Sequence, residues 1–327
     1  MLREYERMHP TMLDYFKYRE ATYSGRGLHK YKHNLLTYWR WLQDRNLDPL
    51  KVKADDMAEY QRHIADRHRT PKGQRLSPSS QVKRLTAVRA YYRFLERSGV
   101  LLVDVSKGLR LPRIPKGVTK RDYLSLQEAT ALLQTQARRT EATRKTKLKW
   151  AIELRNLAFF SLAIATGRRR NGLFELKVDD LDFKRDEIRV SKEKGKTGRV
   201  LPVARWAMMV AREYIELARP RFLSARNSDY LFVSKRNGTL SHQVNSALTE
   251  VHRQTVEENP DLAELAGKRL TPHGLRVTFA KLLFNGGCNL RSVNELMLHD
   301  RLSTTAHYTP LKLEELRRTC RLAHPRA

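Results

Sequence analysis

The sequence has few cysteines and no long apolar run. Cys288 and Cys320 are its only cysteines, too few for a disulfide framework and without the paired spacing of a zinc site. We expect both to be inert buried thiols. No apolar run reaches about 18 residues, and charge begins at Arg3, so neither a membrane-spanning helix nor a signal peptide is expected. The sequence predicts a soluble cytoplasmic protein.

Acidic residues are scarce beside basic ones. The 327 residues include 64 Lys and Arg but 35 Asp and Glu, which gives a net charge of +29. This excess goes beyond what solubility requires and indicates a polyanionic partner, with nucleic acid as the leading candidate. Residues 1–115 carry 24 basic and 12 acidic side chains, and the remainder carries 40 and 23. Both halves therefore share the excess, which favours a protein that surrounds its nucleic acid.

Two segments near the N-terminus have the apolar spacing of amphipathic helices. The first stripe consists of Leu28, Tyr31, Leu35, Trp39 and Leu42, and the second of Val82, Leu85, Val88, Tyr92 and Leu95. The second segment follows serines that can cap a helix and ends near Gly99. We therefore predict an all-helical domain at 1–105. A linker is expected at 106–121, where prolines, glycines and basic residues replace the apolar period.

Residues 122–327 are expected to form a second domain that mixes helices with a few strands. A long apolar helix should end at Gly167, and two short strands, Ile188 to Ser191 and Arg199 to Val203, flank a lysine-rich turn. The segment DYLFVS, at 229–234, is expected to add a third extended piece. The predicted fold class is mainly helical with a small β-sheet, in two domains.

Three basic residues of the second N-terminal helix lie off its apolar stripe. They are Lys83, Arg89 and Arg93. DNA contact and an ordinary solvated basic face explain them about equally well, because basic helix surfaces are common. The overall charge favours DNA contact.

Four separated stretches hold the residues that point to chemistry. ATGRRRNGLFEL, at 165–176, has three consecutive arginines after Gly167, and EKGKTGR, at 193–199, places Lys194 and Lys196 at the tip of the expected hairpin. TPHGLRVTFA, at 271–280, sets His273 and Arg276 on one side of a helix start, and HDRLSTTAHYTP, at 299–310, contains His299 and Tyr308. Each residue alone has an ordinary role open to it, as a backbone contact, a helix cap or a core side chain. The argument rests on the whole set.

In their order and spacing these residues resemble the catalytic set of the tyrosine recombinase (phage integrase) family, which includes the Xer-type and Cre-type recombinases. The T-G-x-R motif of the family falls on 166–169, so Arg169 is the first arginine, with Arg168 and Arg170 as the alternatives in register. The spacing to Pro202 selects Lys194, with Lys196 as the fallback for this role and otherwise as a DNA-binding residue. Arg276 and the two histidines, His273 and His299, match directly, and Tyr308 stands at the expected distance from His299.

The resemblance implies a helical core-binding domain, a linker and a catalytic domain that together clamp DNA. It implies attack by Tyr308 on a phosphodiester and a 3′-phosphotyrosine intermediate. No cofactor, metal or ATP is expected. The chemistry of the phosphodiester agrees, because two guanidiniums can hold its nonbridging oxygens, a histidine can accept the phenolic proton, and a lysine can protonate the leaving oxygen.

Several positions depart from the family pattern. Gly172 stands where an acidic residue commonly follows the first arginine, Val277 replaces the last histidine of H-x-L-R-H, and Leu298 replaces a glycine. None of the six presumed catalytic positions is lost. The departures put in doubt a contact that a residue behind the site would make with the catalytic residues.

The implied partners are double-stranded DNA recombination sites, copies of the chain in a tetrameric synapse, and accessory proteins. No membrane is expected, and the location would be the nucleoid. Two other functions stay open: DNA relaxation of the type IB topoisomerase kind, and DNA binding without catalysis on the same fold. The segment after Tyr308 has the spacing of a short helix that packs either on its own domain or on a neighbouring copy.

Overall fold

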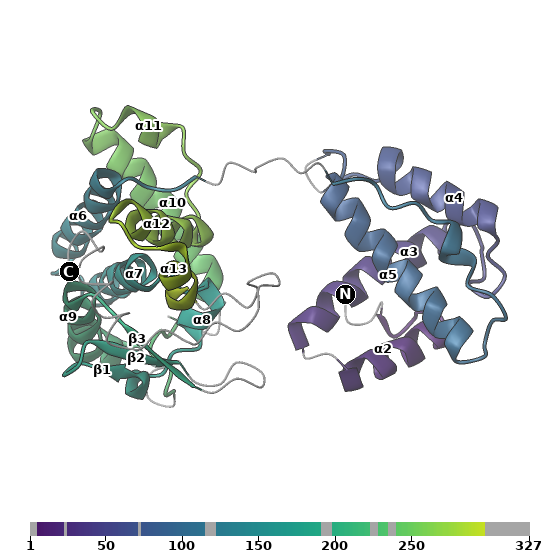
Figure 1. Ribbon diagram of the computed structural model, residues 1–327, viewed down its shortest axis with the longest axis horizontal. Coiled ribbons are helices and arrows are strands. Elements are labelled where there is room, and N and C mark those ends of the chain that lie inside the picture. Colours follow the sequence, from purple (N-terminus) through teal and green to yellow (C-terminus); the bar gives the residue numbers. More distant parts are fainter. Residues whose placement is uncertain are drawn as a thin grey trace. The chain divides into compact units, whose positions relative to one another are not determined.

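The computed structural model describes residues 5–22, 25–70, 73–114, 122–190, 198–222, 228–234 and 240–297. The chain divides into two compact units, 1–118 and 119–327. Helices dominate both, and a three-stranded sheet belongs to the second (Figure 1). The predicted fold class is confirmed. Among the described residues no helix is long and apolar enough to cross a bilayer.

The regular elements in the described part of the N-terminal unit are helices, apart from a single bridge between Arg69 and Arg75 (Figure 1). Its elements are α2 (Pro10–Thr22), α3 (Gly25–Gln43), α4 (Ala54–Arg62), the π-helical turn η1 (His63–Arg67), α5 (Pro78–Arg97) and the 3₁₀ turn η2 (Val105–Gly108). The predicted cap of α5 is present, because the Ser77 hydroxyl accepts a hydrogen bond from the Ser80 N–H at 3.3 Å. Beyond its end, Gly99 has φ +70, a conformation that glycine adopts without strain.

Tyrosines and a tryptophan form much of the core of this unit. The Tyr38 ring packs edge-on against Tyr60 at 4.7 Å between centroids, and Trp41 packs edge-on against Tyr60 at 5.2 Å. The Tyr38 hydroxyl lies 2.8 Å from that of Tyr92, which donates to the Pro49 carbonyl at 2.9 Å. Burial raises the pKa of both Tyr38 and Tyr92 well above the usual range, so both phenols are neutral.

The apolar stripe predicted for α3 is correct at Leu28, Leu35 and Leu42, which are buried. It omitted Tyr38 and Trp41, which are buried more deeply than the predicted Trp39. The reason is that α3 packs against both α2 and α5. Two partners bury a wider face of a helix than a single stripe describes.

We expect Tyr92→Phe to lower the free energy of unfolding by about 1–2 kcal/mol, because it leaves the buried Pro49 carbonyl and the Tyr38 hydroxyl without their partner. Urea unfolding followed by circular dichroism measures the change. The control is Tyr18→Phe, whose side chain is 51% exposed. Equal urea midpoints for the two variants would contradict the expectation.

The second unit is built around α7 (Lys147–Thr166), which is mainly apolar and is buried over most of its length from Trp150 to Thr166. Helices α6 (Leu126–Ala142), α9 (Arg205–Glu213) and α12 (Pro272–Asn285) pack on it, and α10 (Leu240–Glu258) packs on α6 (Figure 1). A helix without a polar face is stable only where neighbours cover it. The predicted end at Gly167 is confirmed: the glycine has φ +57, and its N–H donates to the Ala163 carbonyl at 3.1 Å.

The sheet is antiparallel in the order β1 (Leu181–Asp182), β2 (Glu187–Val190), β3 (Arg199–Pro202). Ile188 pairs with Leu181 on one side and with Leu201 on the other. The two predicted strands are confirmed within the described residues; Ser191 lies outside them, and β3 ends at Pro202.

The predicted third extended piece, 229–234, is not a strand of this sheet. Tyr230 forms a single bridge with Lys177, and the Leu231 N–H donates to the Leu176 carbonyl at 2.7 Å. Its apolar run reflects burial among helices instead: Phe232 packs on Phe159 of α7 at 5.2 Å and on Tyr214 at 5.7 Å. The third strand is β1, whose two residues are too short to produce an alternating pattern.

The described residues on either side of 115–121 are attached to the units. On the N-terminal side, Leu109 is buried in the tyrosine-rich core, and the Arg110 N–H donates to Gln61 Oε1 at 3.0 Å. On the other side, Asp122 Oδ2 accepts from the Arg269 N–H at 2.8 Å, and the Leu124 N–H donates to Thr278 Oγ1 at 2.9 Å. Residues 115–121 lie outside the described residues, so the linker boundaries of 106 and 121 stay a prediction.

The structure describes one of the two cysteines that were expected to be inert buried thiols. Cys288 is buried and unbridged, and burial raises the pKa of its thiol, in keeping with an inert side chain. Cys320 lies outside the described residues.

Candidate active site

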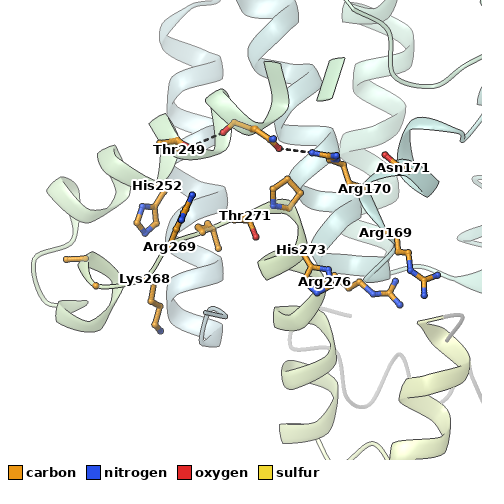
Figure 2. A pocket seen from close by; sticks show the side chains of 15 residues that line it. Arg169, Arg170, Asn171, Thr249, His252, Lys268, Arg269, Thr271, His273 and Arg276 are labelled. Carbon is orange, nitrogen blue, oxygen red and sulfur yellow. Dashed lines mark hydrogen bonds between the residues drawn. The ribbon is translucent and has the colours of Figure 1, made fainter. Parts of the chain in front are cut away.

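A cavity of about 990 Å³ opens between α8 (Arg170–Phe174), α10, α11 (Ala263–Ala266) and the start of α12 (Figure 2). It brings together segments that are about a hundred residues apart in the sequence. Its lining consists of Arg169, Arg170, Asn171, Asn245, Thr249, His252, residues 266–273 and Arg276. Three predicted site residues, Arg169, His273 and Arg276, therefore share one cavity.

Arg276 is fixed by main-chain oxygens. Its guanidinium is 3% exposed and donates from Nη1 to the Gly167 carbonyl at 2.6 Å and from Nη2 to the Met297 carbonyl at 2.8 Å. These oxygens belong to the end of α7 and to the residue after α13 (Leu290–Leu296). The two bonds satisfy buried donors and orient the guanidinium plane, while a carbonyl cancels no net charge.

His273 occupies the first turn of the same helix, three residues before Arg276. Thr271 caps this turn by accepting from the Gly274 N–H at 3.0 Å, and Pro272 supplies a first residue that needs no hydrogen-bond acceptor. His273 is exposed and faces the cavity, whereas Arg276 is buried at its wall. The H-x-x-R pair therefore offers one accessible imidazole and one anchored cation.

The three consecutive arginines point in different directions. Arg168 is 7% exposed and donates from Nη2 to the Gly172 carbonyl at 3.1 Å, away from the cavity lining. Arg169 is exposed, precedes α8 and lines the cavity, where it extends on the same side as Arg276 (Figure 2). Arg170 also lines it and reaches Asn245 Oδ1 of α10 at 3.5 Å. Arg169 is thus the arginine of the three best placed beside Arg276.

Gly172, which replaces the acidic residue common in the family, lies against the side chain of Arg168. A Cβ atom at position 172 would lie 3.1 Å from Arg168 Nη2 and 3.4 Å from Nε. The guanidinium of Arg168 therefore fills the space beside residue 172 into which an acidic side chain would extend.

The wall opposite Arg169 includes residues that the sequence reasoning missed, notably Asn245, Thr249 and His252 of α10 and the pair Lys268 and Arg269. Lys268 Nζ contacts both Glu128 oxygens, at 2.7 and 2.6 Å. The basic dipeptide directly before the H-x-x-R turn was a usable signal for this pair. The residues of α10 gave none, because only the folded chain brings that helix to the cavity.

The remaining predicted residues have separate outcomes. Lys194, Lys196, His299 and Tyr308 lie outside the described residues. On α5 of the N-terminal unit, Lys83 and Arg93 are exposed and Arg89 is half-buried.

Residues 123–315 match the phage integrase family, and residues 14–99 match the N-terminal SAM-like domain of phage integrases. The chain belongs to the phage integrase family. The family expected from the motifs is therefore confirmed. A family relative, tyrosine recombinase XerD of Corynebacterium glutamicum, is 32% identical over 311 residues, which cover 94% of this chain and 95% of that protein.

Solved structures of the family share the fold. The Tn1549 transposon integrase in complex with circular intermediate DNA superposes with a TM-score of 0.61 at 18% identity, over 92% of this chain and 96% of that one. The XerH site-specific recombinase bound to its difH substrate gives 0.60 at 18% identity, over 84% and 74%. Sequence identities this low show that the folds are alike and nothing more.

We expect Gly167→Ala to destabilise the second unit and to reduce DNA cleavage. The new Cβ would lie 2.2 Å from Phe279 Cδ1, and the carbonyl of this residue holds Arg276. Gly287→Ala is the matched control, because Gly287 also has positive φ but has nothing within 4 Å of the added atom. Left-handed backbone strain alone costs roughly 1 kcal/mol. Thermal melts and cleavage assays that gave equal losses for both variants would contradict a role for the Phe279 contact.

Proposed function

We propose that this chain is a site-specific DNA recombinase that cuts and rejoins DNA strands through a covalent bond to Tyr308. The main support for this proposal is one cavity, which is lined by Arg169, His273 and Arg276 from distant segments of the sequence. The chain also has a net charge of +29. Membership of the phage integrase family supports this reading, and relatives named tyrosine recombinase support it further.

In the proposed reaction the two guanidiniums bind the nonbridging oxygens of the scissile phosphate. The transition state concentrates negative charge on these oxygens, so cations already held in place stabilise it more than the ground state. Arg276 is held by two carbonyls and needs little reorganisation. Arg169, which is exposed, can adjust to the bound strand.

The bonds and protons then balance without an added group. The Tyr308 oxygen forms a bond to phosphorus as the bond from phosphorus to the 5′ oxygen breaks. His273 accepts the phenolic proton, Lys194 gives a proton to the departing 5′ oxygen, and His299 donates a hydrogen bond that positions the phosphate. The 3′-phosphotyrosine keeps the energy of the phosphodiester, so a 5′-hydroxyl from a second duplex can reverse the step without ATP or metal.

The proposed substrate is double-stranded DNA held in a synapse of four chains. Exchange between two duplexes breaks both strands of each, which requires four nucleophiles, one from each copy. Relaxation by a single copy requires one nucleophile. The SAM-like N-terminal match and the XerD relatives favour recombination over relaxation, and accessory proteins would select the sites.

The nucleophile is tested with nicked suicide duplexes that carry candidate sites, in buffer with a chelator. We expect the parent chain to form a covalent adduct detected as a slower band in denaturing gels, and Tyr308→Phe to form none. His307→Phe, at the adjacent position, is the control and should retain the adduct. An adduct with Tyr308→Phe would remove Tyr308 from its role, and dependence on metal would point to a nuclease.

The general acid is tested separately. We expect Lys194→Ala to slow cleavage by about 10²–10⁴-fold, the usual contribution of a positioned acid, with DNA binding retained. A 5′-bridging phosphorothiolate, whose leaving group needs no proton, should restore its rate. Lys196→Ala is the matched control on the same segment. If the sulfur substrate rescued Lys196→Ala and not Lys194→Ala, the acid would be Lys196.

A further inference from the structure

The turn that presents His273 is bonded on both of its sides to an earlier segment of the chain. Before the turn, the Arg269 N–H donates to Asp122 Oδ2 at 2.8 Å. After it, Thr278 Oγ1 accepts from the Leu124 N–H at 2.9 Å. The start of α12 is therefore held by a segment that lies about 150 residues earlier in the sequence.

The same segment also packs directly on the turn itself. Gly274 follows His273, and a Cβ atom added to it would lie 3.0 Å from the Asp122 carbonyl oxygen. A backbone oxygen cannot move aside as the end of a flexible side chain can. The Thr278 hydroxyl completes the contact, because it accepts from Leu124 and donates to the Gly274 carbonyl at 3.0 Å. The glycine inside H-x-x-R is thus the residue that allows the close approach.

A buried ion pair ties the segment before the turn to α6. Glu128 is 4% exposed, and its two oxygens contact Lys268 Nζ at 2.7 and 2.6 Å. Its Oε2 also accepts from the Ser125 N–H at 2.7 Å, within the capping box of α6. Water and salt weaken a buried ion pair much less than an exposed one. The pair therefore fixes the main chain at Lys268 relative to α6.

The placement of this turn decides where the imidazole of His273 lies. A general base must reach within hydrogen-bond distance of the proton that it accepts. A displacement of about 1 Å can cost on the order of 10²-fold in rate, even when the mutation that causes it is far from the reacting atoms. Contacts that hold the turn therefore bear on the rate of the chemical step.

We propose that Asp122 and Glu128 are positioning residues, which hold the H-x-x-R turn so that His273 meets the phenolic proton of the nucleophile. This inference rests on the proposed function for the reaction that it serves. The described lining of the cavity includes neither carboxylate. Asp122 acts through the main chain of Arg269, and Glu128 acts through Lys268. The same geometry assigns Lys268 to holding the cavity wall.

Asp122 is tested by single-turnover cleavage of a nicked suicide duplex at saturating DNA. We expect Asp122→Ala to slow cleavage by roughly 10- to 100-fold, with an unchanged Kd measured by anisotropy in chains that also carry Tyr308→Phe. Asp122→Asn keeps an oxygen that can accept from Arg269 and should restore most of the rate. Thermal melts establish that each variant is folded. Cleavage by folded Asp122→Ala at the parent rate would overturn the role of Asp122.

Glu128 and Lys268 are tested as a pair in the same assay. Glu128→Gln keeps an acceptor for the capping box and removes the ion pair, and Lys268→Met removes its other half. Both should slow cleavage, and the double variant should be no slower than the slower single one, because all three lose the same contact. Glu264→Gln is the matched control: Glu264 lies 3.8 Å from the same lysine, but its side chain is 90% exposed.

The double variant also covers the case in which a single variant fails to fold. It leaves no buried charge of the pair without a partner, which is the costly state. Cleavage by the folded double variant at the parent rate would overturn the role of the pair, as would losses in the two single variants that multiply in the double one.

A direct phosphate contact by Lys268 predicts a different result. Loss of such a contact would reduce the slope of log affinity against log salt by about 1. We expect Lys268→Met to keep the parent slope, because its ammonium is held by Glu128. A reduced slope would overturn the assignment of Lys268 to the cavity wall.

Hydrogen exchange followed by mass spectrometry reads the attachment of the turn without catalysis. Asp122→Ala should speed exchange in the peptide around 269–278 and leave that of α9 unchanged. Unchanged exchange in both peptides would overturn the proposal. Absence of an adduct from the parent chain would overturn the recombinase reaction and the positioning role together. Adducts that form at the parent rate in Asp122→Ala and in the double variant would overturn the positioning role alone.

Discussion

The arrangement of the second unit depends on the way its main chain holds a buried guanidinium. Arg276 joins the end of α7 to the residue after α13 through two carbonyl oxygens, while its own helix carries His273. Three helix ends must therefore be in place before the cavity has its shape. Gly167 makes this possible, since only a residue without a side chain fits against Phe279 in that left-handed turn.

Carbonyl oxygens are a recurrent partner for buried arginines in this unit. Arg155, which is 1% exposed, donates to the Val233 carbonyl at 3.1 Å and to the Gln243 side-chain oxygen at 3.0 Å. Arg168 donates to the Gly172 carbonyl. A carbonyl oxygen accepts hydrogen bonds from a buried guanidinium and carries no net charge to set against the positive one.

Much of this architecture followed from local patterns. Apolar spacing and capping residues located α3 and α5, Gly167 marked the end of α7, and H-x-x-R identified the start of α12. What failed depended on neighbours distant in the sequence. One helix cannot reveal that two others cover it, which hid the burial of Tyr38 and Trp41. Likewise, the apolar run around Phe232 resembles a strand until α7 covers it, and only the turn after Gly167 decides that Arg168 points inward while Arg169 faces the cavity.

Residues 122–128 are attached to α12 and to the segment that precedes it. Asp122 binds the main chain of Arg269, Leu124 binds Thr278, and Glu128 holds Lys268. These bonds fasten both sides of the turn that presents His273. The described chain from Asp122 onward therefore first contacts the second unit beside α12, so tension on this segment would act on the H-x-x-R turn as well as on the start of α6.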